Sequence, residues 1–157
     1  MHPSPTKTLL IPALAPLYRL GEPLAYALLR AGYGVIMLTH GLPKLLGQSH
    51  GSMADPMAAS VRLIENALHL PMPQLIGLLI ALLEAGGGAL LVLGLGTRLV
   101  ALLMGLQMLT ISWLLGPTWP WIDRGIEYPV LMALLSFYIM FRGAGRYSLD
   151  HTAGREL

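Results

Sequence analysis

Apolar residues form four runs that are long enough to cross a lipid bilayer as α-helices. We place these runs at residues 24–46, 73–95, 99–117 and 126–142. A hydrocarbon core of roughly 30 Å requires about 20 helical residues, and the second and third runs reach this length with almost no charge. The fourth run is shorter and spans with little tilt. The pattern predicts an all-α integral membrane protein with a four-helix transmembrane bundle.

The connections between the runs differ in length and polarity. Gly94 and Gly96 separate the second run from the third, and left-handed backbone at these glycines would close a tight hairpin between antiparallel helices. The first and second runs are separated by a longer loop with an amphipathic stretch near residues 57–70. We expect this stretch to lie on the membrane surface.

The two ends of the chain are expected to lie outside the transmembrane domain of residues 24–143. Lys7 and the apolar residues 9–15 resemble a signal peptide, but this apolar core is short and is interrupted by proline. We therefore expect residues 1–23 to form an uncleaved N-terminal interfacial arm. Residues 144–157 are expected to form a cytoplasmic tail.

The distribution of Lys and Arg predicts the orientation in the membrane. With both termini on one side, that side holds all of the ten Lys and Arg residues except Lys44, Arg62 and Arg124. We therefore expect both termini to lie on the cytoplasmic side of a plasma (inner) membrane that the chain crosses several times. The loop of residues 47–72 would then face the exterior.

Composition supports a membrane location and excludes several classes of function. Hydrophobic residues make up 55% of the chain and charged residues only 11%, against roughly 25% charged residues in a soluble domain. The lipid bilayer is therefore the first partner. Cysteine is absent, which excludes disulfides and thiolate chemistry within this chain. The net charge of +2 is scattered, so we expect no nucleic-acid partner.

Glu84 is the most informative residue of the second run. It lies eleven positions after Pro73, which places it about 16 Å into the membrane. A lone carboxylate there is costly unless it is neutral or paired with a cation. Arg30, His40 and Lys44 share one broad face of the first run and are the candidate partners. We expect Glu84 to form a polar pocket with Arg30 or His40.

Two roles for Glu84 remain open. Gly77, Ala81 and Gly88 share its helix face, and such small residues let another helix approach closely. Glu84 would then belong to a structural ion pair within a packing seam. Alternatively it handles protons or binds a ligand, and we favour this interpretation because ionisable groups within membranes are usually functional.

Other polar residues extend the candidate site. Gln107, in the middle of the third run, either hydrogen-bonds to Glu84 or holds helices together. Trp113 and Tyr128 are candidates for stacking or hydrogen-bonding walls of a ligand pocket. Glu127 begins the fourth helix, where the helix dipole favours a carboxylate, so a structural role is the preferred interpretation.

His40 has three interpretations. A metal or haem would need a second ligand that the first run does not supply, and His50 and His69 lie in a loop, so we expect no metal. The pKa range of an imidazole suits proton exchange with a quinol. The remaining interpretation is an interfacial residue without chemistry.

Four segments of the chain resemble the DoxX family of small bacterial and archaeal membrane proteins. These segments are LLRAGYGVIMLTHGLPKLL (28–46), LLEAGGGALLVLGLGTRLVAL (82–102), GIEYPVLMAL (125–134) and RGAGRYSLD (142–150). The resemblance implies a four-helix membrane module, and some relatives are associated with quinone-linked oxidation, including subunits of thiosulfate:quinone oxidoreductase and of terminal quinol oxidase preparations. The positions that it carries over are Arg30, His40, Gly41, Lys44, Glu84, Gly87, Gly88, Glu127 and Tyr128.

The leading hypothesis is a subunit of a quinone-linked membrane oxidoreductase, with a quinone as its lipid-soluble ligand. The catalytic candidates are Glu84 and His40, and the ligand-binding candidates are Arg30, Lys44, Gln107, Trp113, Glu127 and Tyr128. The expected partners are a soluble or membrane oxidoreductase subunit and a second copy of the chain, which the glycine-rich faces 86–88 and 94–96 favour. The alternative is a noncatalytic membrane scaffold or small-solute carrier in which the ion pair serves assembly.

Overall fold

The computed structural model describes residues 9–123 and 125–154, and all the regular elements in these ranges are helices. The prediction of an all-α protein is therefore confirmed. The elements are η1 Pro12–Leu14, α1 Ala15–Leu46, α2 Pro56–Asn66, α3 Pro73–Leu82, η2 Leu83–Gly87, α4 Gly88–Leu93, α5 Thr97–Leu115, η3 Trp121–Asp123, α6 Glu127–Arg142 and α7 Leu149–Ala153.

Local sequence signals explain several helix ends. Asp55 caps α2 by accepting a hydrogen bond from the Ala58 N–H at 2.8 Å. Gly47 ends α1 with a φ of 62°, a left-handed conformation that glycine adopts without strain. Helix α1 begins at Ala15, so the second half of the expected N-terminal arm continues the first span as helix. Lys7, the basic residue of the signal-like segment, lies outside the described residues.

Among the residues that the structure describes, two segments are long and apolar enough to cross a membrane. They are Pro73–Leu93, which consists of α3, η2 and α4, and Thr97–Leu115, which is α5. They correspond to the second and third predicted spans. Leucines on both remain exposed, among them Leu79, Leu82 and Leu106. An apolar exterior of this kind is the surface that lipid requires.

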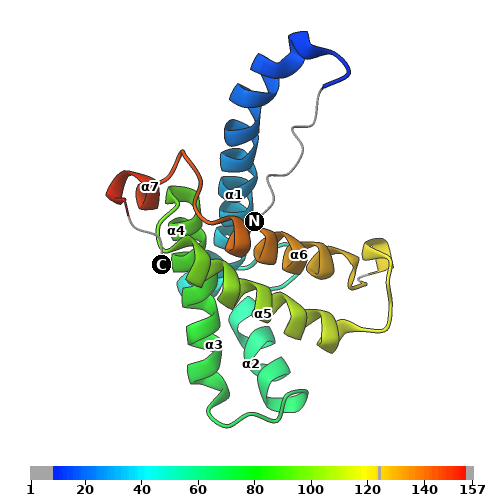
Figure 1. The fold of residues 1–157 in the computed structure, drawn as a ribbon. Helices are drawn as coiled ribbons and strands as arrows, with labels where there is room; N and C mark the ends of the chain where they lie inside the picture. The colour runs from blue at the N-terminus through cyan, green and yellow to red at the C-terminus, as the bar shows by residue number, and fades with distance from the viewer. Residues whose placement is uncertain (1–8, 124, 155–157) are drawn as a thin grey trace, which may run out of the picture.

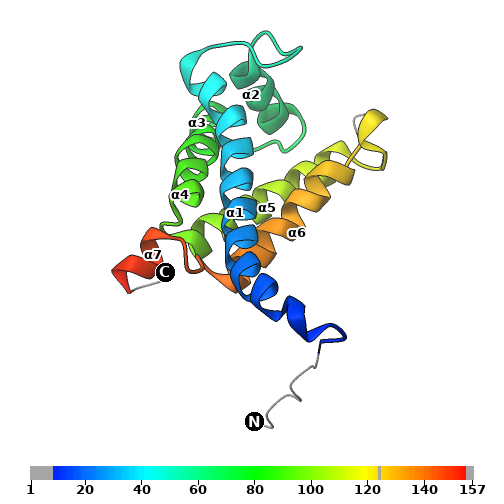
Figure 2. The same ribbon diagram turned by 90° about the horizontal axis from the view of Figure 1, so that it is seen from above.

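The helices form two diverging groups joined by α1 (Figures 1 and 2). Helices α5 and α6 lie side by side. The separation between this pair and α2 and α3 grows with distance from the Gly94–Gly96 turn. These two glycines adopt φ values of 69° and 59°, which confirms the predicted left-handed conformation. The divergence of α5 from α3 differs from the tight antiparallel hairpin expected for these two runs. Helix α2 packs on α3, where Gly77 faces Val61 and Met57.

Helix α1 packs closely against η2 and α4 through glycines. A Cβ atom on Gly34 would lie 2.5 Å from the Gly88 carbonyl oxygen, and one on Gly88 would lie 2.7 Å from the Gly34 carbonyl oxygen. Gly41 lies directly against the backbone of Ala85. The close approach predicted at Gly88 is confirmed, because only hydrogen fits between these backbones.

Most of the glycines that favoured a homodimer are used within the chain. Gly87 lies against Met104, and Gly94 lies against Arg30 and Ser148, whereas Gly86 and Gly96 have open space beside them. Packing within the chain and the left-handed turn therefore explain these glycines except Gly86. The homodimer stays a prediction.

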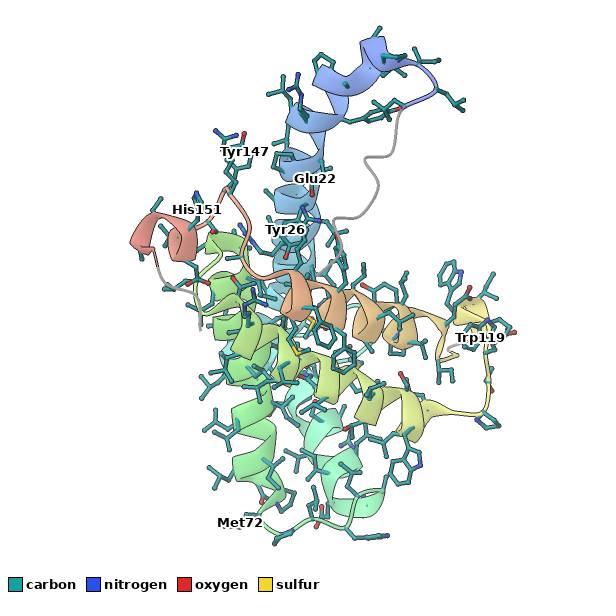
Figure 3. All side chains as sticks on the ribbon, in the orientation of Figure 1. Glu22, Tyr26, Met72, Trp119, Tyr147 and His151 are labelled. Atoms are coloured by element: carbon teal, nitrogen blue, oxygen red, sulfur yellow. The ribbon has the colours of Figure 1, made fainter. Side chains whose placement is uncertain are left out.

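The segment after α6 is docked onto the Gly94–Gly96 turn. The Asp150 carboxylate accepts the backbone N–H groups of Gly96 at 2.9 Å and Thr97 at 3.1 Å, which caps the N-terminus of α5. Figure 3 labels Tyr147 and His151 in this segment, beside α1 and α4. The part of the expected tail that the structure describes, residues 144–154, is therefore packed against the bundle.

Candidate ligand-binding site

Glu84 lies inside the molecule on a short π-helical segment. The side chain is buried, and the segment Leu83–Gly87 interrupts the α-helical hydrogen bonding between α3 and α4. One-turn π segments within α-helices occur frequently at functional sites. This segment places the Cβ atom of Glu84 opposite Gly41 of α1, whose lack of a side chain permits the approach.

The Glu84 carboxylate is held by three hydrogen bonds. Lys44 Nζ lies 2.8 Å from Oε1 and 2.7 Å from Oε2, and Gln107 Nε2 donates to Oε1 at 2.7 Å. The expected cation from the first span is therefore Lys44. Of the two roles considered for Gln107, the hydrogen bond to Glu84 is the observed one. Charge-assisted bonds to both oxygens stabilise the ionised carboxylate.

The expectation that Arg30 helps to form the pocket around Glu84 is wrong. Arg30 is buried, and its guanidinium donates to the carbonyl oxygens of Leu91 at 2.9 Å, Tyr147 at 2.7 Å and Ala144. Arg30 and Lys44 share a helix face, but fourteen residues separate them by about 21 Å along the axis. The contacts of Gly34 with Gly88 and of Gly41 with Ala85, which we call the glycine seam, set Glu84 at the level of Gly41. At that level Glu84 is within reach of Lys44.

A cavity of about 510 Å³ lies beside the ion pair, in the size range of ligand pockets. Its walls come from α1, α2, α3, η2, α5 and α6, between the diverging helix groups. Most of its lining is hydrocarbon, for example Ile36, Leu83, Ile111 and Met132. Its polar groups include those of His40, Lys44, Glu84, Gln107 and Tyr128.

His40 lies close to a second histidine. The ring centroids of His40 and His50 are 4.8 Å apart, with an interplanar angle of 65°. No group of three His, Asp or Glu residues suited to hold a metal ion occurs among the described residues. A metal at this pair would have two imidazole ligands, fewer than the three or four protein ligands typical of zinc sites.

The three remaining candidates have different surroundings. Tyr128 lines the cavity. Trp113 is 73% exposed and is not among the described residues that line it. Glu127 accepts a hydrogen bond from the backbone N–H of Trp121 at 3.2 Å, which matches the preferred structural interpretation. The structure thus joins Tyr128 to the site and leaves Trp113 and Glu127 outside it.

The wall formed by α2 was missed from the sequence. Ala59, Ser60 and Leu63 of α2 line the cavity, and Met53 lines it from the preceding loop. The amphipathic pattern of residues 57–70 predicted a helix with one apolar face, but it was assigned to the membrane surface. The apolar face instead packs on α3 and closes one side of the cavity.

The chain was found to match a model of a known protein family. The model of the family described as DoxX matches residues 25–117, more than half of the 157-residue chain. The matched range contains His40, Lys44, Glu84 and Gln107 and ends before α6. No curated protein and no solved structure matches the chain.

Proposed function

Because the chain belongs to the DoxX family and is a membrane protein, we propose that it binds a quinone or another lipid-soluble ligand in the cavity beside Glu84. One observation carries the proposal: a buried Glu84–Lys44 ion pair forms part of the wall of a mostly apolar cavity of about 510 Å³. A hydrocarbon lining with a few convergent polar groups suits a ligand that has an apolar body and a polar head.

In this proposal the chain is a subunit of a quinone-linked oxidoreductase. Oxidation of a quinol releases two protons and two electrons. His40 lines the cavity and would accept the two protons one after the other, passing the first toward the outer face before it takes the second, while Lys44 and Gln107 hold the Glu84 carboxylate in place. Because the chain has no cysteine, the electrons would pass to a partner oxidoreductase subunit.

We further propose that α1 and α6 also cross the membrane, giving four spans in the plasma (inner) membrane. Helix α6 has 16 residues and covers about 24 Å, which is enough for a nearly perpendicular span. Arg142 pairs with Glu22, and Arg98 donates to the carbonyls of Met140 and Phe141. The gathering of these arginines at one end of the molecule supports a cytoplasmic location for that end.

Photoaffinity labelling tests the ligand proposal. An azido-quinone would be added to the purified protein in nanodiscs, and the labelled peptides would be mapped by mass spectrometry. We expect label on peptides that line the cavity, competition by unlabelled quinone, and at least a several-fold loss of labelling in Glu84→Gln. Thr110→Val is the matched control, because Thr110 lines the same cavity but its hydroxyl bonds to the Leu106 carbonyl of its own helix.

Label that unlabelled quinone does not displace, or that spreads evenly over the lipid-facing surface, would overturn the proposal. The alternative, a noncatalytic scaffold or small-solute carrier, is favoured by one observation: both oxygens of Glu84 are already hydrogen-bonded within the chain. That alternative predicts a lower yield of folded Glu84→Gln protein, with labelling per folded molecule unchanged.

A further inference from the structure

The orientation of the Gln107 amide is determined by its partner. Gln107 Nε2 lies 2.7 Å from Glu84 Oε1, and the same carboxylate is bonded through both oxygens to Lys44. An ionised carboxylate only accepts hydrogen bonds, so the nitrogen of the amide must face Glu84. The carbonyl oxygen of the amide is therefore turned away from the ion pair.

Gln107 Oε1 is a buried acceptor without a donor. It is covered from solvent and accepts no hydrogen bond from the described residues. Leaving such an atom unpaired is unfavourable, because a buried acceptor loses its bonds to water. Gln107 also lines the cavity, so a ligand there lies against the residue that carries this unpaired acceptor.

Lys44 provides the complementary group. An ammonium carries three N–H donors, and Lys44 directs two of them to Glu84. The third is available to an acceptor in the cavity, which Lys44 also lines. One unpaired acceptor and one donor therefore belong to residues that line the same, otherwise mostly apolar, cavity.

A hydroxyl group matches both residues at once, because its O–H donates to Gln107 Oε1 while its oxygen accepts from Lys44. A carbonyl or ether oxygen only accepts, so it leaves Gln107 Oε1 unpaired. We propose that the cavity selects lipid-soluble ligands with a hydroxyl on the head group and that Gln107 determines this specificity. Among redox carriers, the site then favours the hydroquinone over the quinone. This inference rests on the proposed function, namely that the cavity binds such a ligand.

Selectivity between matched ligands tests the inference. Binding of tritiated 4-nonylphenol and 4-nonylanisole, which differ by a hydroxyl and a methoxy group, would be measured on the protein in nanodiscs at equal membrane concentrations. We expect the wild type to bind the phenol at least about ten-fold more tightly, the scale of one lost hydrogen bond to a buried acceptor. A decyl-benzoquinone and its hydroquinone, measured under argon, should show the same order.

Two variants locate the source of the selectivity. In Gln107→Met the phenol-to-ether ratio should fall to within about three-fold, because the acceptor is removed while an apolar side chain of similar length remains. In Thr39→Val the ratio should stay as in the wild type, because Thr39 is exposed on α1, is not among the described residues that line the cavity, and donates to the Ile36 carbonyl of its own helix. If Gln107→Met does not fold, the comparison on the wild type still tests the preference for a hydroxyl, and equal binding of phenol and ether would overturn the proposal.

The outcomes separate the two proposals. Equal binding of phenol and ether to the wild type, or an unchanged ratio in folded Gln107→Met, would overturn the specificity and leave the cavity as a ligand site. Binding of neither ligand pair would overturn the proposed function, and the specificity with it.

Discussion

At the scale of single residues, the candidate site depends on the cation that reaches the buried Glu84 carboxylate. Three basic side chains of the first span share a face, and helical spacing alone does not give the level at which two helices meet. The packing of Gly41 against Ala85 sets that level and brings Lys44 to Glu84. Arg30 was misassigned because its partners are backbone carbonyls, and no sequence pattern marks a carbonyl as an acceptor.

The ion pair gives a test of stability. Lys44→Met leaves the buried Glu84 carboxylate without its cation, and we expect it to lower the free energy of unfolding by about 3–5 kcal/mol. In Lys44→Met/Glu84→Gln no charge remains, so much of this loss should be recovered. Reversible unfolding in mixed detergent micelles measures both variants.

Arg62→Gln is the control for that experiment. Arg62 is exposed on α2, so its replacement should change stability by no more than about 0.5 kcal/mol. If Lys44→Met/Glu84→Gln were as unstable as Lys44→Met, the unpaired Glu84 charge would not be the cause of the lower free energy of unfolding.

At the scale of elements, the apolar pattern predicted the main helices but not their local distortions. The π-helical segment at Leu83–Gly87 depends on one extra residue in a hydrogen-bonded turn, which apolar periodicity does not report. The role of α2 depended on the direction of its apolar face, and that face meets α3 only because Gly77 leaves room for Val61. Both features follow from packing between helices.

The glycine seam between α1 and α4 gives a matched pair of substitutions on one helix. Gly34→Ala would place a methyl group against the Gly88 carbonyl oxygen, and we expect it to destabilise the fold by about 1–3 kcal/mol. Gly32→Ala meets open space and should be neutral or stabilising by up to about 1 kcal/mol, because alanine favours the helix. The same detergent unfolding assay measures both, and equal effects would contradict the seam.

At the scale of the whole molecule, composition and span length were enough to indicate an all-helical membrane protein. They did not predict that the α5–α6 pair diverges from α2 and α3, which creates the space for the cavity (Figure 2). Nor did they predict the docking of the last segment, because Asp150 and its neighbours are polar and resemble an ordinary tail. Long-range contacts of this kind are not encoded in local pattern.

The absence of cysteine makes the proposed topology directly testable. Two single-cysteine variants, Ser52→Cys and Ala153→Cys, would be made. Ser52 lies in the loop before α2, Ala153 lies at the end of α7, and both residues are exposed. We expect a membrane-impermeant maleimide to label Ser52→Cys in intact spheroplasts and Ala153→Cys only after permeabilisation. The unmodified chain serves as the blank. Labelling of both variants from outside would contradict four spans, and the reverse pattern would invert the orientation.

The contacts of Arg30 and Asp150 affect how the protein is made. During translation Arg30 emerges 114 residues before Ala144 and 117 before Tyr147, and Thr97 emerges 53 residues before Asp150. A nascent chain halted after α6 therefore carries a guanidinium without two of its acceptors and an α5 without its cap. These contacts of Arg30 and of the α5 N-terminus can therefore form only after residues 144–150 have been synthesised.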